Sequence, residues 1–338
     1  PFTEKEKLEF IGFVACLMSS IEIANALSDF SEYMISSQEF EPGSGWDYNF
    51  LEKVNSNMTS LELGKLIIDY FDSYYSSKKY SKGYSLSLLK LSKIDNVINN
   101  TDLLFEKIDN NLEIDFSSVS RTRSDSKSFG RLKNEEYYYD LVDFSDLLDK
   151  LPTKYEKEIS NLKGALNDLV IYQKTDLDNT YGVSLYFPYE NKNNININMD
   201  KYQNLNYSKV YTNFLNDFSN TLTKEKMYDW NLENGLINID NNSISIELSN
   251  DVINNYSSAE YIIFEKKDEY FIPIFTGSDF VVNDNKLTTK IEKKSIVVKY
   301  ENEEFTTTAI ESKDGLNYKS YLIPATVTRV NKDTFTID

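Results

Sequence analysis

An apolar run passes directly into a helix signal near the start of the chain, with a cysteine between the two. Phe10 to Ala15 is apolar and long enough for a buried strand. Ser19 and Glu22 have the spacing of a capping box, which marks the start of a helix. Cys16 falls between them and is the one cysteine among 338 residues. This order predicts an α/β fold with Cys16 at the sheet edge where ligands bind.

Two interpretations of Cys16 stay open at this point. A single cysteine is commonly a small buried hydrophobic residue. At the end of a strand and the start of a helix, however, backbone N–H groups and the helix dipole favour a reactive thiolate.

The segments around Cys16 resemble the nucleophile region of the clostripain family of cysteine peptidases, which have a caspase-like fold. The resembling segments are Gly12 to Glu22, Tyr33 to Glu39, Glu41 to Tyr48 and, more loosely, Gly182 to Pro188. The resemblance implies part of a caspase-like α/β/α sandwich. It also implies that Cys16 attacks the scissile carbonyl of a protein or peptide substrate to form an acyl-enzyme.

The family nucleophile works with a histidine, and this sequence contains none. In the family the histidine precedes the cysteine, and processing between the two gives a light and a heavy chain. The resemblance therefore implies that this chain is the heavy chain of an endopeptidase. It also implies that a light-chain partner supplies the histidine, and that Pro1 lies near a processing point or an artificial end.

The resemblance also places the S1 pocket, which holds the substrate residue before the scissile bond. In the family an acid two residues before the cysteine gives a preference for arginine or lysine there. That position is Val14 in this chain, and a buried guanidinium beside it would lack a partner. The substrate-binding residues implied are Val14, Ser36, Ser37, Glu39, Gly45, Trp46 and Asp47.

The segment from Glu39 to Tyr48 is predicted to be a loop because its Pro-Gly-x-Gly sequence breaks both helix and strand. Glu39, Glu41 and Asp47 could replace the missing acid, although surface charge is the competing interpretation and the one we favour for Glu41. Trp46 is either a lid over the pocket or a packing anchor.

Charge and hydropathy argue against several classes of partner. The net charge of −18 disfavours nucleic acid and anionic membranes. No apolar run is long enough to span a membrane, and no Cys/His cluster indicates a metal site. Calcium and a secreted or cell-surface location are implied by the resemblance only.

The sequence pattern changes near residue 227. Before this point helical spacing alternates with short apolar runs, whereas after it short alternating runs are separated by turn residues. We therefore expect a caspase-like domain over residues 1–226 and an all-β, sandwich-like domain over residues 227–338, with the boundary between Thr223 and Asp229.

Two further interpretations remain. The chain could be a catalytically inactive, peptidase-like subunit that binds or adheres through its β domain. Ser117 to Gly130 is polar and locally basic, so Arg121, Arg123, Lys127 and Arg131 could face an acidic substrate group. A solvated loop is the interpretation that we favour for this segment.

Overall fold

The computed structural model describes residues 7–78, 83–130, 139–190, 195–205 and 207–224, together with strand segments between 237 and 337. Two compact units divide the chain, Pro1–Met227 and Tyr228–Asp338. Each unit is described by itself.

The main sheet of the first unit has four strands in the order β1-β2-β3-β6. They are β1 (Leu8–Gly12), β2 (Ser31–Ser36), β3 (Ser85–Lys90) and β6 (Val170–Thr175). β1 and β2 are parallel because α1 (Ile21–Leu27) crosses over between them. The other neighbours are antiparallel. A smaller antiparallel sheet contains β4 (Ser128–Phe129), β5 (Leu141–Asp143) and β7 (Ser184–Tyr186).

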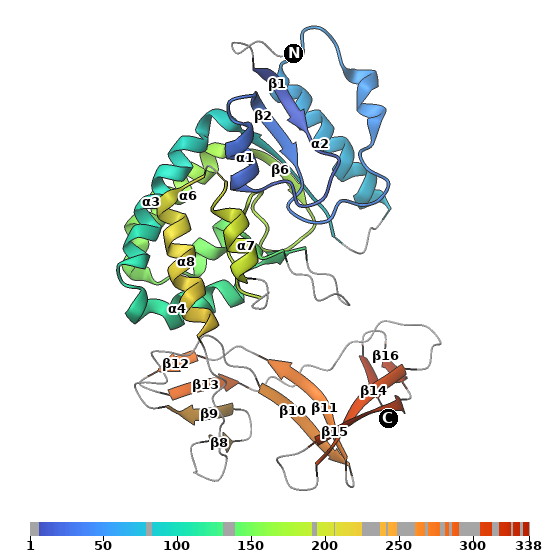
Figure 1. Ribbon diagram of the computed structural model, residues 1–338. Helices are drawn as coiled ribbons and strands as arrows, with labels where there is room; N and C mark the ends of the chain where they lie inside the picture. The colour runs from blue at the N-terminus through green and yellow to red at the C-terminus, as the bar shows by residue number, and fades with distance from the viewer. Residues whose placement is uncertain are drawn as a thin grey trace. The chain divides into compact units, whose positions relative to one another are not determined.

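Helices cover both faces of the main sheet (Figure 1). On one face lies α2 (Ser60–Ser77), which packs with η1 (Tyr48–Lys53). The other face carries α3 (Ile94–Asp109), α4 (Leu112–Asp125), α5 (Phe144–Lys150), α6 (Glu156–Leu169), α7 (Ile195–Tyr202) and α8 (Lys209–Thr223). The short turns η2 (Leu91–Lys93) and η3 (Thr153–Tyr155) precede α3 and α6.

The strand alternation explains why there are two cores. Met34 and Ile35 are neighbours on β2, so their side chains point to opposite faces. Met34 joins the core formed with α3 and α8, whereas Ile35 joins the core formed with α2. The prediction of an α/β fold is therefore confirmed for the first unit.

Besides Ser19 and Glu22, Thr59 and Glu62 also have the spacing of a capping box, and the two predicted boxes have different outcomes. At α2, the Thr59 hydroxyl accepts the N–H of Glu62, and a Glu62 carboxylate oxygen accepts the N–H of Thr59, as expected. At α1 the capping residue is Ser20, whose hydroxyl accepts the N–H of Ile23. The predicted box at Ser19 is therefore wrong.

Contacts from a distant segment replace the box at Ser19. The Ser19 hydroxyl donates to the carbonyl of Gly182 (2.7 Å). The Glu22 carboxylate accepts the backbone N–H of Tyr186 (3.0 Å) instead of capping the helix.

Three other boundaries also differ from the prediction. The strand predicted over Phe10 to Ala15 ends at Gly12, and residues 112–125 form α4, so Ser117 onward is not a loop. The loop predicted over residues 191–198 is wrong in its second half, where α7 begins at Ile195. Residues 191–194 and Arg131 lie outside the described part.

The described strands of the second unit pair antiparallel in the orders β12-β13-β9-β8, β10-β11-β14-β15 and β16-β17. Whether residues 227–338 form a sandwich stays a prediction. The strands are β8 (Ile237–Asp240), β9 (Ser243–Glu247), β10 (Tyr261–Lys267), β11 (Tyr270–Gly277), β12 (Val281–Asn283), β13 (Lys286–Lys290), β14 (Phe305–Ser312), β15 (Tyr318–Ala325), β16 (Val327–Asn331) and β17 (Thr334–Ile337).

Among the residues described in both units, no helix combines the length and the hydropathy needed to cross a membrane.

Candidate active site

Cys16 lies in a turn after β1 rather than at the end of the strand, and its side chain is exposed. The next residue, Leu17, has a φ of 63°, which is uncommon for a residue with a side chain. Strained backbone of this kind is typical of functional sites, although it does not identify one by itself. The Cys16 sulfur accepts the backbone N–H of Glu41 at 3.3 Å.

Backbone hydrogen bonds hold this nucleophile turn, residues 13–19, against the residues that follow β2. The N–H of Phe13 donates to the carbonyl of Ile35 (2.9 Å). The N–H groups of Leu17 and Ser19 donate to the carbonyls of Glu39 (3.2 Å) and Ser37 (2.9 Å). The sulfur is therefore presented by a backbone that is fixed on both sides of Cys16.

Ser36 and Ser37 are fully buried beneath this contact. The Ser37 hydroxyl donates to the carbonyl of Glu39 (2.9 Å) and lies 3.2 Å from the hydroxyl of Ser85. Ser37 therefore supports the segment after β2, whereas the Ser36 hydroxyl is buried with no hydrogen-bond partner in the described part of the chain. The role of both serines in substrate binding stays a prediction.

Trp46 is a packing anchor. Its side chain is buried, and a Cβ placed on Gly12 would lie 2.6 Å from the indole Cη2, so the ring fits only against a glycine. Gly45 has a φ of 67°, and its carbonyl accepts the Tyr75 hydroxyl at 2.6 Å. The two interpretations left open for Trp46 are thus resolved in favour of packing.

Val14 is 47% exposed, and its Cγ1 lies 3.2 Å from the position that a Cβ on Gly45 would take. The alternation of a strand was expected to point Val14 and Cys16 the same way. That reason fails because β1 ends at Gly12. Both side chains are nevertheless exposed beside the same loop.

The three carboxylates of the loop differ in their partners. Glu39 accepts the N–H groups of Phe40 (2.8 Å) and Gly130 (3.2 Å) on one oxygen. Asp47 caps η1 by accepting the N–H of Asn49 (3.1 Å). Each of these two carboxylates is therefore already engaged with the backbone.

Glu41 is the exception, and it is not the surface charge that we expected. Its Oε1 accepts the indole N–H of Trp46 (3.1 Å). Its Oε2 is buried and has no hydrogen-bond partner within the described part of the chain. Burial raises the pKa of Glu41 to about 7. The hydrogen bond from Trp46 lowers this pKa, but its effect is smaller than that of burial.

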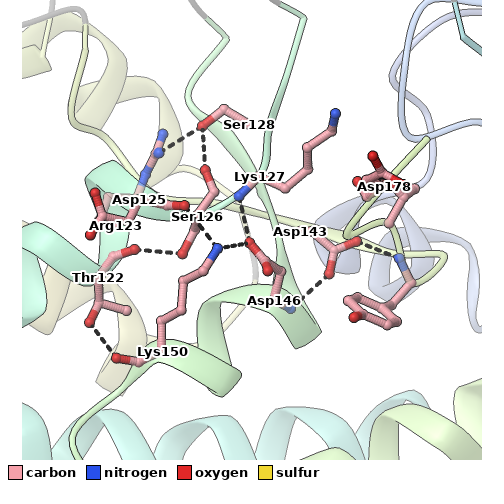
Figure 2. A network of polar contacts seen from close by, with 12 residues as sticks. Thr122, Arg123, Asp125, Ser126, Lys127, Ser128, Asp143, Asp146, Lys150 and Asp178 are labelled. Carbon is pink, nitrogen blue, oxygen red and sulfur yellow. Dashed lines mark hydrogen bonds and ion pairs between the residues drawn. The ribbon is translucent and has the colours of Figure 1, made fainter. Parts of the chain in front are cut away.

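A buried polar network fixes β4 next to the nucleophile turn (Figure 2). Arg123 is fully buried and donates to the carbonyl of Phe187 (2.7 Å), the hydroxyl of Ser128 (2.9 Å) and the carboxylate of Asp140 (3.3 Å). The expectation that Arg123 faces solvent or substrate is therefore wrong. The β4 segment ends at Gly130, where a Cβ would lie 3.0 Å from Leu17.

Asp143 and Gln38 form the second part of this network, and the sequence analysis missed both. The amide of Gln38 donates to Asp143 (2.9 Å) and accepts the N–H of Gly182 (2.6 Å). Asp143 also accepts the N–H groups of Tyr181 (2.7 Å) and Asp146 (2.9 Å). An aspartate directly before the helical pattern of α5 was the one signal that could have indicated Asp143 as a cap.

The described residues supply a nucleophile and backbone donors but no imidazole, since the sequence has no histidine. Nor do they contain a cluster of three or more His, Cys, Asp or Glu side chains able to hold a metal ion.

Comparisons with known proteins support these observations at the level of the family. The family model described as the clostripain family matches residues 2–239. Comparison with curated proteins gives no match.

Several solved structures are similar. An inactive zymogen C11 protease from Parabacteroides distasonis is 23% identical over 61% of this chain and 59% of its own, with a TM-score of 0.49. A cysteine protease of B. fragilis is 20% identical over 62% of this chain and 88% of its own (TM-score 0.47). A clostripain from Bacteroides thetaiotaomicron in complex with a peptide inhibitor is 23% identical over 53% and 78% (TM-score 0.41). The present chain thus spans 59% of the first of these structures.

Proposed function

The chain belongs to the clostripain family of cysteine peptidases, and from that premise we propose that it is the heavy chain of a cysteine endopeptidase with Cys16 as its nucleophile. One observation carries the proposal: the Cys16 sulfur is exposed in a sharp turn and accepts a backbone N–H. A cysteine that acts as a nucleophile must have a sulfur that a substrate can reach.

The reaction then follows from the chemistry of a thiol and an imidazole. A histidine from a light chain takes the thiol proton, and the sulfur forms a bond to the scissile carbonyl carbon. Backbone N–H groups, including that of Cys16, hold the resulting oxyanion. The imidazolium gives its proton to the leaving amine as the C–N bond breaks, and a water activated by the imidazole hydrolyses the thioester.

The edge of the main sheet supports the light-chain partner. Among the described strands, β1 pairs only with β2, so its other edge is open. Leu8 on this strand is 36% exposed. An open strand edge presents N–H and C=O groups that another strand can pair with. A light-chain strand bound there would lie next to the strand that leads to Cys16, which suits delivery of an imidazole.

We place the S1 pocket between Val14 and the loop from Glu39 to Asp47. Val14 provides no carboxylate, so efficient cleavage after arginine would depend on Glu39 or Asp47. Val14→Asp should raise kcat/KM for an arginine substrate by up to about fivefold, the modest value expected for a charge pair at an exposed position. Val14→Asn is the matched control without the charge. Equal values for the two variants would remove Val14 from the pocket.

The decisive experiment labels the assembled protein with an acyloxymethyl ketone peptide and follows covalent modification by intact mass. We expect labelling of the complex of light and heavy chains and none with Cys16→Ala, which should leave the circular dichroism spectrum unchanged. Residues 1–338 alone should not turn over a peptide substrate. Turnover by this chain alone, or labelling that persists in Cys16→Ala, would overturn the proposal.

An assembled protein that is never labelled would favour the alternative, a peptidase-like subunit for binding or adhesion. The lack of histidine and of the acid at Val14 is the observation behind this alternative. In that case residues 227–338, which we propose form a separate β-sandwich-like domain, would be the working part. Secretion or display at the cell surface, which the family resemblance implies, also stays a proposal.

A further inference from the structure

The contact between Glu41 and the nucleophile is made by the backbone. The N–H of Glu41 points at the Cys16 sulfur at 3.3 Å. A hydrogen bond to the charged form of a group favours that form. The reactivity of the sulfur therefore depends on how firmly the Glu41 N–H is held in place.

The residues before Glu41 fix one side of this N–H. The Glu39 carbonyl accepts the N–H of Leu17 (3.2 Å), and the Glu39 carboxylate accepts the N–H of Gly130 (3.2 Å). These contacts tie the incoming backbone to the nucleophile turn and to the end of β4.

Trp46 fixes the other side. Its indole N–H donates to Glu41 Oε1 (3.1 Å), and its ring packs on Gly12, the last residue of β1. Four residues further along the chain lies Cys16. These contacts form a closed path. It runs from Gly12 to the Trp46 indole, from the indole to Glu41, from the Glu41 N–H to the Cys16 sulfur, and back to Gly12 along the backbone.

Burying the Glu41 carboxylate in this position costs free energy. One oxygen has a single donor, and the other is buried with no partner in the described part of the chain. Burial without compensation disfavours the charged carboxylate, which agrees with the raised pKa of Glu41. A Glu41 side chain pointing to solvent would avoid this cost, and what it makes in the buried position is the hydrogen bond from the Trp46 indole.

We propose that Trp46 and Glu41 are positioning residues whose indole–carboxylate contact holds the Glu41 backbone N–H against the Cys16 sulfur and so raises the reactivity of the nucleophile. The consequence for peptide hydrolysis rests on the proposed function. The reactivity of the sulfur does not, because it can be measured in the isolated chain.

The measurement is the rate of alkylation by iodoacetamide as a function of pH. The chain has one cysteine, so the signal reports Cys16 alone. Glu41→Met keeps the approximate volume but removes the acceptor, whereas Glu41→Gln keeps an acceptor for the indole and removes the charge. Glu52→Met, at an exposed position of η1, is the control for loss of a carboxylate elsewhere.

We expect Glu41→Met to slow alkylation at pH 7 about tenfold, the lower end of what a hydrogen bond to a charged group contributes. Glu41→Gln should stay within about threefold of the unmodified chain, and Glu52→Met should match it. Equal slowing by Glu41→Met and Glu41→Gln would show that only the charge matters, and no slowing by either would show that the contact is packing alone. Both results overturn the proposal.

Thermal unfolding of each variant checks that it folds. If Glu41→Met does not fold, Trp46→Phe removes the indole N–H while keeping an aromatic ring, and it should give the same slowing. Unchanged alkylation by folded Trp46→Phe would overturn the proposal. An assembled protein that lacks peptidase activity but shows these alkylation rates would refute the proposed function and leave the positioning role intact.

Discussion

The loop from Glu39 to Asp47 and the network around Arg123 both reach the nucleophile turn, and both contain buried charged groups. In the network, Asp143 receives three donors and Arg123 donates to three acceptors. Figure 2 shows two of these contacts, from Asp146 to Asp143 and from Arg123 to Ser128. In the loop, Glu41 has one donor and one buried oxygen without a described partner.

The network around Arg123 therefore serves as a framework that stabilises the fold, whereas the loop from Glu39 to Asp47 is the reactive part, which acts on the Cys16 sulfur. A buried charge whose hydrogen bonds are all made stabilises one arrangement, and removing one partner from it is costly. A buried carboxylate that is only partly satisfied contributes little stability through its own hydrogen bonds, because burial without compensation disfavours its charged form. We therefore expect mutations in the network to act on stability, and mutations in the loop to act mainly on the Cys16 sulfur.

The largest effect should come from Arg123→Met. It leaves Asp140 buried without this cation, so the free energy of unfolding should fall by about 3–5 kcal/mol in urea denaturation. Lys127→Met is the control. The Lys127 ammonium lies 5.9 Å from the centre of the Phe129 ring and makes no ion pair with the described residues, so its loss should cost less than about 1 kcal/mol. Equal losses for the two variants would mean that Arg123 is not part of a framework.

The second largest effect should be the pH dependence of folding stability that Asp143 causes. Burial raises the pKa of Asp143 from 3.8 to about 6. The folded state then binds more protons than the unfolded state between these values, so this contribution to stability is lost as the pH rises from about 4 to about 6. The loss is at most about 3 kcal/mol. The free energies of unfolding of the unmodified chain and of Asp143→Asn, measured by urea denaturation across this range, should differ by an amount that changes with pH. A constant difference would contradict the assignment.

The smallest effect on stability is expected for Gly12→Ala in the reactive part. The new methyl group would clash with the Trp46 ring, so overpacking should cost about 1–3 kcal/mol. It should also slow alkylation of Cys16, because the indole contact with Glu41 shifts. Gly43→Ala, whose Cβ would meet nothing within 4 Å, should leave both measurements unchanged. Slower alkylation in Gly43→Ala as well would show that the loop responds to any change and that Trp46 has no special part.

Local signals in the sequence were sufficient for much of the fold. The parallel arrangement of β1 and β2 follows from the helix between them, and the capping box at Thr59 lies within four consecutive residues. The exposure of Cys16 agrees with the expectation from the order of strand, cysteine and helix, although β1 ends earlier than predicted. These features depend on neighbours in the chain, and periodicity and turn chemistry report such neighbours directly.

The tertiary structure alone decided the partners of the polar side chains. Ser19 and Glu22 had the spacing of a capping box, yet their partners are Gly182 and Tyr186, more than 160 residues away. Arg123 looked like a charge on a polar loop and is buried against Phe187. A serine, a glutamate or an arginine makes its hydrogen bonds with whatever the fold brings near, because a buried polar group without a partner costs more free energy than a local cap contributes. The sequence by itself therefore determined many of the elements and the place of Cys16 between a strand and a helix. Only the folded chain determined which charges are buried and which groups contact the sulfur.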